Sequence, residues 1–202
     1  MQKKVNIAIF ASGAGSNAEK IIQHFENNPA IQVKLVVSNK KEAGVLTIAA
    51  AYQIPTLMIQ RSLFNETDDY IHLLKEAQID LIILAGFLWK VPSNLVAAFQ
   101  GRIINIHPAL LPKFGGKGMY GHFVHEAVIE SGDTESGISI HLVDDHYDHG
   151  RTLFQATCLV EAGDDADKLA GKIHQLEHAH FSEVIEQYII EHPELFSNGS
   201  FL

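Results

Sequence analysis

Asn105 and His107 are two polar residues at the end of an apolar run, in the segment Asn-Ile-His-Pro. In an extended strand, residues i and i+2 project from the same side, so both side chains can reach one reacting group. An amide beside an imidazole can stabilise a developing oxyanion and manage protons, provided that a carboxylate tunes the ring. A single histidine at a strand end is more often structural. Here Pro108 and Pro112 fix the chain directly after the pair, which favours the chemical interpretation.

A glycine-rich turn, Gly13-Ala14-Gly15-Ser16-Asn17, separates the first apolar run from the first helical pattern. Its glycines let backbone N–H groups converge on an anion at a helix N-terminus, so the turn could bind a phosphate without a lysine. With Ala18 the run also fits the dinucleotide fingerprint G-x-G-x-x-G/A. However, the second predicted strand ends in Ser38-Asn39, without the acid expected to bind a ribose hydroxyl. A tight turn without a ligand is the third interpretation.

Two later segments are rich in acids and histidines. Residues 141–150 contain three histidines and three aspartates, a density typical of a divalent metal site or of a polar active-site loop. Residues 174–178 read His-Gln-Leu-Glu-His, which fits the H-x-x-E-H pattern of a zinc peptidase and places both histidines on one helix face. A solvated helix face is the favoured interpretation of this second segment, because the sequence identifies neither a third ligand nor a substrate cleft.

The elements that must position these residues follow from hydrophobic periodicity. Apolar runs of strand length alternate with helical patterns through the first half, as expected for a parallel sheet with crossover helices. These strands lack a polar face, so helices are expected on both sides of the sheet. The predicted strands are Val5–Ala11, Val33–Ser38, Thr56–Ile59, Leu81–Ala85 and Ile103–Ile106. The predicted helices between them are Asn17–Phe25, Gly44–Tyr52, Glu66–Ala77 and Ser93–Phe99.

The second half of the chain has a different pattern of predicted elements. A glycine-rich loop, Phe114–Gly121, precedes a helix near His122–Ser131 and two strands, Gly137–Val143 and Thr152–Leu159. The connection between these strands is too short for a crossover helix, so they are expected to be antiparallel. Apolar residues at helical spacing over Asp165–Ile190 predict one long helix. The fold class is therefore α/β, a Rossmann-like and mostly parallel sheet flanked by helices, with an antiparallel strand pair near the C-terminal part and a long C-terminal helix.

The composition disfavours several classes of function. The 202 residues carry 15 Lys+Arg against 24 Asp+Glu, a formal net charge of −9, which disfavours a broad nucleic-acid or anionic-membrane surface. The single cysteine, Cys158, excludes an internal disulfide and fits a reducing compartment. Residues 5–11 suit a buried strand better than a signal peptide, and the longest other apolar run, residues 81–89, is shorter than the roughly 18 residues of a membrane span. We expect a soluble, cytoplasmic protein with one domain, residues 1–202.

These motifs together resemble the phosphoribosylglycinamide formyltransferase family of folate-dependent enzymes. The matching segments are IAIFASGAGSN, VVSNKKEAGVLTIA, LAGFLWKVP, GRIINIHPALLPKF, GISIHLVDDHYDHG and KIHQLEHAHF, in the family's order and over nearly the whole chain. The joint occurrence of SGxGSN, NIHPxLLP and HxVxxxxDxG is specific. The resemblance implies transfer of a formyl group from 10-formyltetrahydrofolate, as co-substrate, to the amino group of 5′-phosphoribosylglycinamide in purine biosynthesis. It implies small-molecule substrates, no metal, and a monomer or homodimer.

The resemblance also assigns residues. The catalytic group falls on Asn105, His107 and Asp148. The ribonucleotide phosphate loop falls on Gly15, Ser16 and Asn17, and the far substrate wall on His174 and Glu177. The folate pocket falls on Asn105 and on two further segments, comprising Leu88, Trp89, Lys90 and Val91, and Asp144, Asp145, His146, Tyr147 and Asp148. Residues 1–100 would then form the half that binds the ribonucleotide phosphate, and residues 101–202 the catalytic and folate-binding half.

Three features depart from the family pattern. Many members have an arginine where this chain has Thr67. Many have a short histidine-containing loop after LLPK, whereas this chain has the longer FGGKGMYGHFVH, so His122 and His125 receive no role. His149 replaces a common glycine beside Asp148, which should leave the carboxylate available.

The implied mechanism is direct transfer through a tetrahedral intermediate. Asn105 and protonated His107 would donate hydrogen bonds to its oxygen, while Asp148 favours the imidazolium and orients a water that carries a proton. Sister enzymes that hydrolyse the formylfolate or formylate methionyl-tRNA share this pattern but usually carry an extra domain, which favours the small ribonucleotide here. A zinc hydrolase and a non-catalytic nucleotide-binding module remain the alternatives from other classes.

Overall fold

The computed structural model describes residues 4–196, which form a seven-stranded sheet in the order β3-β2-β1-β4-β5-β6-β7. The first five strands run parallel, and β6 is antiparallel to both β5 and β7. The predicted mostly parallel sheet with an antiparallel C-terminal pair is thus confirmed. The strands are β1 (Val5–Phe10), β2 (Ile31–Ser38), β3 (Thr56–Met58), β4 (Leu81–Leu84), β5 (Ile103–His107), β6 (Glu135–Leu142) and β7 (Thr152–Leu159).

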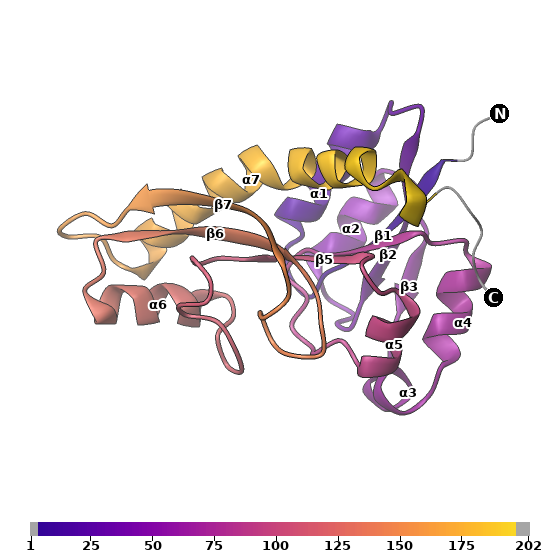
Figure 1. Cartoon of the computed structure of the whole chain (residues 1–202), viewed down its shortest axis with the longest axis horizontal. Helices are drawn as coiled ribbons and strands as arrows, with labels where there is room; N and C mark the ends of the chain where they lie inside the picture. The colour runs from indigo at the N-terminus through magenta and orange to yellow at the C-terminus, as the bar shows by residue number, and fades with distance from the viewer. Residues whose placement is uncertain (1–3, 197–202) are drawn as a thin grey trace.

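Helices cover both faces of the sheet, as the missing polar face of the strands predicts (Figure 1). One face packs under α1 (Ser16–Phe25), α2 (Gly44–Ala51) and the long α7 (Ala166–Glu191), and the other under α3 (Arg61–Glu66), α4 (Asp69–Glu76) and α5 (Ser93–Ala98). Helix α6 (His122–Ser131) packs against α7 beside the antiparallel strands, and a short 3₁₀ helix, Pro193–Leu195, ends the described chain.

The two cores are separated by the alternation of side chains along each strand. Ile7 and Ile9 on β1 join the core under α1 and α7, whereas Ala8 and Phe10 join the core under α4 and α5. Because all four are fully buried or nearly so, residues 7–10 of β1 form a continuous apolar run rather than an alternating one. Among residues 4–196, no helix combines the length and apolar content needed to cross a bilayer.

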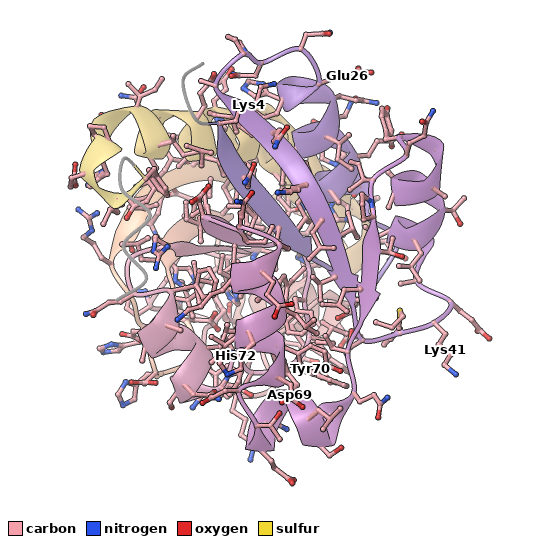
Figure 2. The ribbon with its side chains drawn as sticks, turned by 90° about the vertical axis from the view of Figure 1, so that its right-hand side faces the viewer. Lys4, Glu26, Lys41, Asp69, Tyr70 and His72 are labelled. Atoms are coloured by element: carbon pink, nitrogen blue, oxygen red, sulfur yellow. The ribbon has the colours of Figure 1, made fainter. Side chains whose placement is uncertain are left out.

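One predicted helix has a different start, and one helix was not predicted. The helix predicted over Glu66–Ala77 is α4, which begins only at Asp69, and the sequence pattern missed α3 before it, with Thr67 between them in an extended conformation. The Thr67 hydroxyl donates to the Leu63 carbonyl at 2.9 Å and accepts from the Asp69 N–H at 3.3 Å. A threonine that bonds neighbouring backbone in this way competes with helix continuation, so the chain turns there. Figure 2 shows the labelled Asp69, Tyr70 and His72 on α4, below the sheet.

The sheet brings the polar motifs to one end. The turn after β1, the loop after β4 and the last residue of β5 all lie at the carboxyl ends of parallel strands, where open α/β sheets bind ligands. Strand β6 pairs with β5 so that His141 lies opposite Asn105 and Ser139 opposite His107. The register of this antiparallel pair therefore decides which side chains of β6 lie beside Asn105 and His107.

Candidate active site

A cavity of about 840 Å³ lies at this end of the sheet and gathers nearly all the residues that the sequence assigns to a site. Its walls come from the turn after β1, the loops after β4 and β5, the segment between β6 and β7, and one side of α7. Asp145 is the exception, because it is exposed and does not line the cavity. The other assigned residues all line it, namely Gly15, Ser16, Asn17, Leu88, Trp89, Lys90, Val91, Asn105, His107, Asp144, His146, Tyr147, Asp148, His174 and Glu177.

His107 is the last residue of β5 and is 3% exposed. Its Nε2 lies 2.8 Å from the Phe114 carbonyl oxygen, which can only accept, so this nitrogen carries a hydrogen. Nδ1 then faces the Asp148 carboxylate at 3.7 Å. Burial lowers the pKa of His107, against the opposing effect of Asp148. The free protein therefore holds a mainly neutral ring near pH 7, with Nδ1 as its available base.

Asp148 is held where its carboxylate can serve two rings. Its backbone is left-handed, with φ of 53°, a conformation that Asp and Asn tolerate better than most residues. One carboxylate oxygen accepts from the Gly116 N–H at 2.9 Å, and the other lies 3.7 Å from His141 Nε2. Burial alone would raise the pKa of Asp148, but the nearby His141 and His107 rings and the Gly116 N–H hold it below its ordinary value. The carboxylate is therefore ionised near pH 7.

His141 is a site residue to which the sequence analysis assigns no role, although it lies in the segment rich in acids and histidines. The ring is 2% exposed, and its Nδ1 donates to the Leu142 carbonyl at 2.8 Å. Its Nε2 then accepts from the Asn105 amide at 3.0 Å, which leaves the second amide N–H of Asn105 free. The signal that could have found His141 is the strand register, since an antiparallel β5–β6 pair places it beside Asn105.

The glycine turn forms the opposite end of the cavity. Gly15 is left-handed, with φ of 89°, and directly precedes α1. A Cβ there would lie 2.8 Å from Val45 Cα, so a larger residue would displace the backbone of α2. No side chain caps this helix start within the described residues, so the N–H groups of its first turn remain for an anion. This geometry fits a phosphate better than a turn without a ligand.

Helix α7 closes the far wall with Glu177. This residue is 5% exposed, and its Oε2 accepts from the Asn17 amide at 2.9 Å and contacts His174 Nδ1 at 2.9 Å. The hydrogen bond with Glu177 raises the pKa of His174. Glu177 therefore connects α7 to the start of α1 at the glycine turn.

Metal-ligating atoms do not converge at the H-x-x-E-H segment. His174 and His178 stack with ring centroids 6.2 Å apart, and Glu177 is bonded to Asn17 rather than free for a metal. Across residues 4–196, three such atoms come together only at Asp144, His146 and His149. Both histidines of that group are exposed. Hydrogen bonds from the His146 N–H and the His149 ring to Asp144 explain why the three residues lie close together. The arrangement disfavours zinc at residues 174–178, and the buried Glu177 shows that this helix face borders the cavity rather than open solvent.

Aromatic and cationic side chains line the remaining wall. Lys90 Nζ lies 5.6 Å from the ring centroid of Tyr147, and Arg61 lies 5.8 Å from that of Trp89. The Leu88 N–H donates to Ser12 Oγ at 2.9 Å, which fixes this loop to the turn after β1. Thr67, where the resemblance implies an arginine, does not line the cavity.

The glycine-rich loop after β5 also borders the cavity, from Gly116 to Gly121, followed by His122 and His125. It reaches the catalytic group through the Phe114 carbonyl and the Gly116 N–H. His125 is a second lining residue without an assigned role, and it is only 4% exposed. His125 receives no role from the sequence, because the loop before it is longer than in the family pattern.

The fold and the residues of the cavity agree with a comparison of this chain with known protein families. Residues 5–185 match the formyl transferase family, so this chain belongs to that family.

Two curated relatives have names that are more specific than the family description. Phosphoribosylglycinamide formyltransferase, chloroplastic, of Arabidopsis thaliana is 40% identical over 189 residues, which cover 91% of this chain and 65% of that protein. The trifunctional purine biosynthetic protein adenosine-3 of Homo sapiens is 33% identical over 203 residues, 98% of this chain and 20% of that protein. The chain thus spans less than two thirds of the length of these curated relatives.

Solved structures agree with the fold over nearly their full length. Phosphoribosylglycinamide formyltransferase from Anaplasma phagocytophilum superposes with a TM-score of 0.85 at 31% identity, covering 94% of this chain and 89% of that one. The enzyme of the same name from Bacillus halodurans gives 0.82 at 32% identity, covering 91% and 95%.

Proposed function

We propose that this protein transfers a formyl group from 10-formyltetrahydrofolate to the amino group of 5′-phosphoribosylglycinamide, a step of de novo purine biosynthesis. The observation that carries the proposal is the meeting of Asn105, His107 and Asp148 in one cavity that the glycine turn also lines. The names of the relatives support the same activity.

The two substrates would enter from opposite sides of the catalytic group. The ribonucleotide phosphate would bind the N–H groups of the turn at Gly15–Asn17, with Glu177 and His174 along its side. The folate would occupy the wall formed by residues 88–91 and by Asp144, His146, Tyr147 and Asp148. In this arrangement residues 1–100 mainly hold the phosphate, and residues 101–202 supply the catalytic groups and part of the folate wall.

Asn105 and His107 would act on the tetrahedral intermediate. The substrate amine attacks the formyl carbon, a carbon–nitrogen bond forms, and the formyl oxygen becomes an oxyanion. The free N–H of Asn105 would donate to that oxygen, and fixed donors of this kind stabilise developing charge without reorganisation. The proton of the attacking amine then moves to N10 of the folate, the bond from N10 to the formyl carbon breaks, and tetrahydrofolate leaves. These steps require no metal and no covalent intermediate on the protein.

The lowered pKa of His107 refines the role of this ring. It would begin neutral, with Nδ1 as the base, rather than as the imidazolium in the hypothesis from the sequence. A developing oxyanion opposite the ring, together with Asp148 at 3.7 Å, favours protonation during the reaction. His107 and Asp148 would thus accept and return the proton that travels from the amine to N10.

An acceptor assay tests the function. Purified protein is incubated with 10-formyltetrahydrofolate and, in turn, 5′-phosphoribosylglycinamide, initiator methionyl-tRNA or water. We expect formylation of the ribonucleotide alone, without loss of activity in chelator. Formylation of the tRNA or hydrolysis of the folate would assign the chain to a sister activity. Turnover that stops in chelator and returns with zinc would instead favour the zinc hydrolase.

We also propose that the protein works in the cytoplasm as a monomer or homodimer. The described residues of one chain line the cavity and include all the catalytic residues that the proposal assigns. A net charge of −9 supports small-molecule partners rather than a nucleic acid or an anionic membrane.

A further inference from the structure

His125 is a buried polar residue that the proposed chemistry leaves without a role. It lies in the first turns of α6, is 4% exposed, and lines the cavity. Within residues 4–196, no hydrogen bond reaches its Nδ1, which is shielded from solvent. Buried nitrogens in native proteins are nearly always paired, so an unpaired one in a ligand cavity suggests a partner supplied by the ligand.

The titratable groups that act on His125 belong to α6, α7 and β5. Its pKa is lowered to about 4 by burial, with the Glu177 carboxylate opposing and the His174, His122 and His107 rings adding to the shift. The ring is therefore neutral near pH 7 and offers one donor and one acceptor. A neutral ring close to Glu177 and His107 suits an uncharged polar part of a ligand rather than its phosphate.

The ribose of the ribonucleotide is an uncharged polar group of this kind. Its phosphate belongs at the turn of Gly15–Asn17 and its amine at His107, so the ribose with its two adjacent hydroxyls lies between them. Glu177 lies on the same wall and can accept from a hydroxyl. A hydroxyl can also accept from or donate to a neutral imidazole. Resting on the proposed function, we infer that His125 binds a ribose hydroxyl of the ribonucleotide substrate and so helps to set acceptor specificity.

Replacement of His125 by phenylalanine tests this contact. The variant keeps a ring of similar size but cannot form a hydrogen bond. We expect KM for the ribonucleotide to rise about tenfold, the effect of one lost hydrogen bond, while kcat and KM for the folate change less than twofold. His125→Asn, which keeps a side-chain donor and acceptor, should recover part of the loss and provides a second variant if the phenylalanine protein does not fold.

Ribonucleotide analogues that lack the 2′- or the 3′-hydroxyl identify the contact itself. The wild type should lose affinity for at least one analogue, and His125→Phe should lose no more for that analogue, because the contact is already absent. Equal losses in both proteins, or an unchanged KM for the intact ribonucleotide in His125→Phe, would mean that a bound water satisfies the nitrogen and would overturn the inference.

His178 offers a matched control. It also has a buried ring nitrogen, Nε2, without a partner among the described residues, and burial lowers its pKa, but it does not line the cavity. His178→Phe should leave both KM values unchanged, and Tm would report any general loss of stability. Calorimetric titration with the ribonucleotide alone separates the two proposals. A wild type that does not bind it contradicts the proposed function, whereas equal binding by wild type and His125→Phe contradicts only the role of His125.

Discussion

The phosphate turn and the catalytic wall are built in different ways. The turn is local, since Gly13–Asn17 join β1 directly to α1 and present backbone N–H groups. The catalytic wall brings together side chains from three distant places, with Asn105 on β5, His141 on β6 and Asp148 in the following loop. The local site depends on the backbone conformation of the turn. The catalytic wall depends on the register of β5 and β6 and on the loop between β6 and β7.

This contrast predicts different outcomes of mutation in the two regions. Substitutions on the catalytic wall should lower kcat while the fold persists, because they remove individual side-chain groups. Substitutions in the turn should raise KM and lower stability together, because the same backbone conformation serves both the ligand and the packing of α1 against α2.

The largest effect is expected for Asn105→Ala. Losing the oxyanion donor should lower kcat by a factor on the order of 10²–10³. Steady-state kinetics at saturating concentrations of both substrates measures this loss. Asn94→Ala is the control, because Asn94 bonds to Thr67 and Asp68 outside the cavity. Near-normal kcat in Asn105→Ala would remove Asn105 from the oxyanion site.

Asp148→Asn should have the next largest effect. Asparagine tolerates the left-handed backbone of this residue and keeps its size, so the change mainly removes the charge that faces His107. We expect kcat to fall on the order of 10², within the range for assisted proton transfer, and Tm to fall moderately, because the lowered pKa of Asp148 means that its ionised carboxylate also stabilises the folded state at pH 7. Asp69→Asn, an exposed carboxylate on α4 labelled in Figure 2, should have no effect on kcat. If Asp148→Asn retains full activity, Asp148 does not assist His107.

The same contrast explains how much could be predicted from the sequence. Apolar runs of strand length and helical spacing gave the sheet, the antiparallel pair and the long helix, and the family resemblance gave fewer than half of the described residues that line the cavity. Non-local geometry was harder to predict. His141 becomes a site residue only through its pairing with Asn105, and Asp145 lies outside the cavity although its neighbours line it. The break at Thr67 depends on a side-chain hydrogen bond to the backbone, which helical periodicity does not reveal.

Gly15→Ala tests the backbone site. The added Cβ would meet Val45 at 2.8 Å in a left-handed conformation, so α1 or α2 must move. We expect a loss of about 2–3 kcal/mol in the free energy of unfolding, in the upper part of the range for strained backbone, together with a raised KM for the ribonucleotide. Chemical denaturation and kinetics measure the two effects.

Gly163→Ala is the matched control for that change. Gly163 is also left-handed, with φ of 93°, but it lies outside the cavity lining and no atom of the described residues lies within 4 Å of its added Cβ. The substitution should cost only the conformational penalty of about 1–2 kcal/mol, without a change in KM for the ribonucleotide. Equal losses of stability in both variants would show that contact with Val45 does not constrain the turn.

The smallest effect expected is the pH dependence of stability in the catalytic region. The pKa of His125 is lowered to about 4, from an ordinary value of 6.5. The unfolded chain therefore binds more protons than the folded chain between these values, and the free energy of unfolding falls as pH falls through that window. From pH 7 to pH 5 the contribution of His125 is about 2 kcal/mol.

His107 and His178, whose pKa values burial also lowers, act in the same direction. His174 acts in the opposite direction, because its raised pKa adds stability that is lost as pH rises. Asp148 has a lowered pKa, so its contribution is lost only as pH falls below the ordinary carboxylate range. The difference between wild type and His125→Phe therefore isolates one ring. Urea unfolding at pH 7 and pH 5 should give a smaller decline in the variant, and identical declines would mean that His125 is already protonated at pH 5.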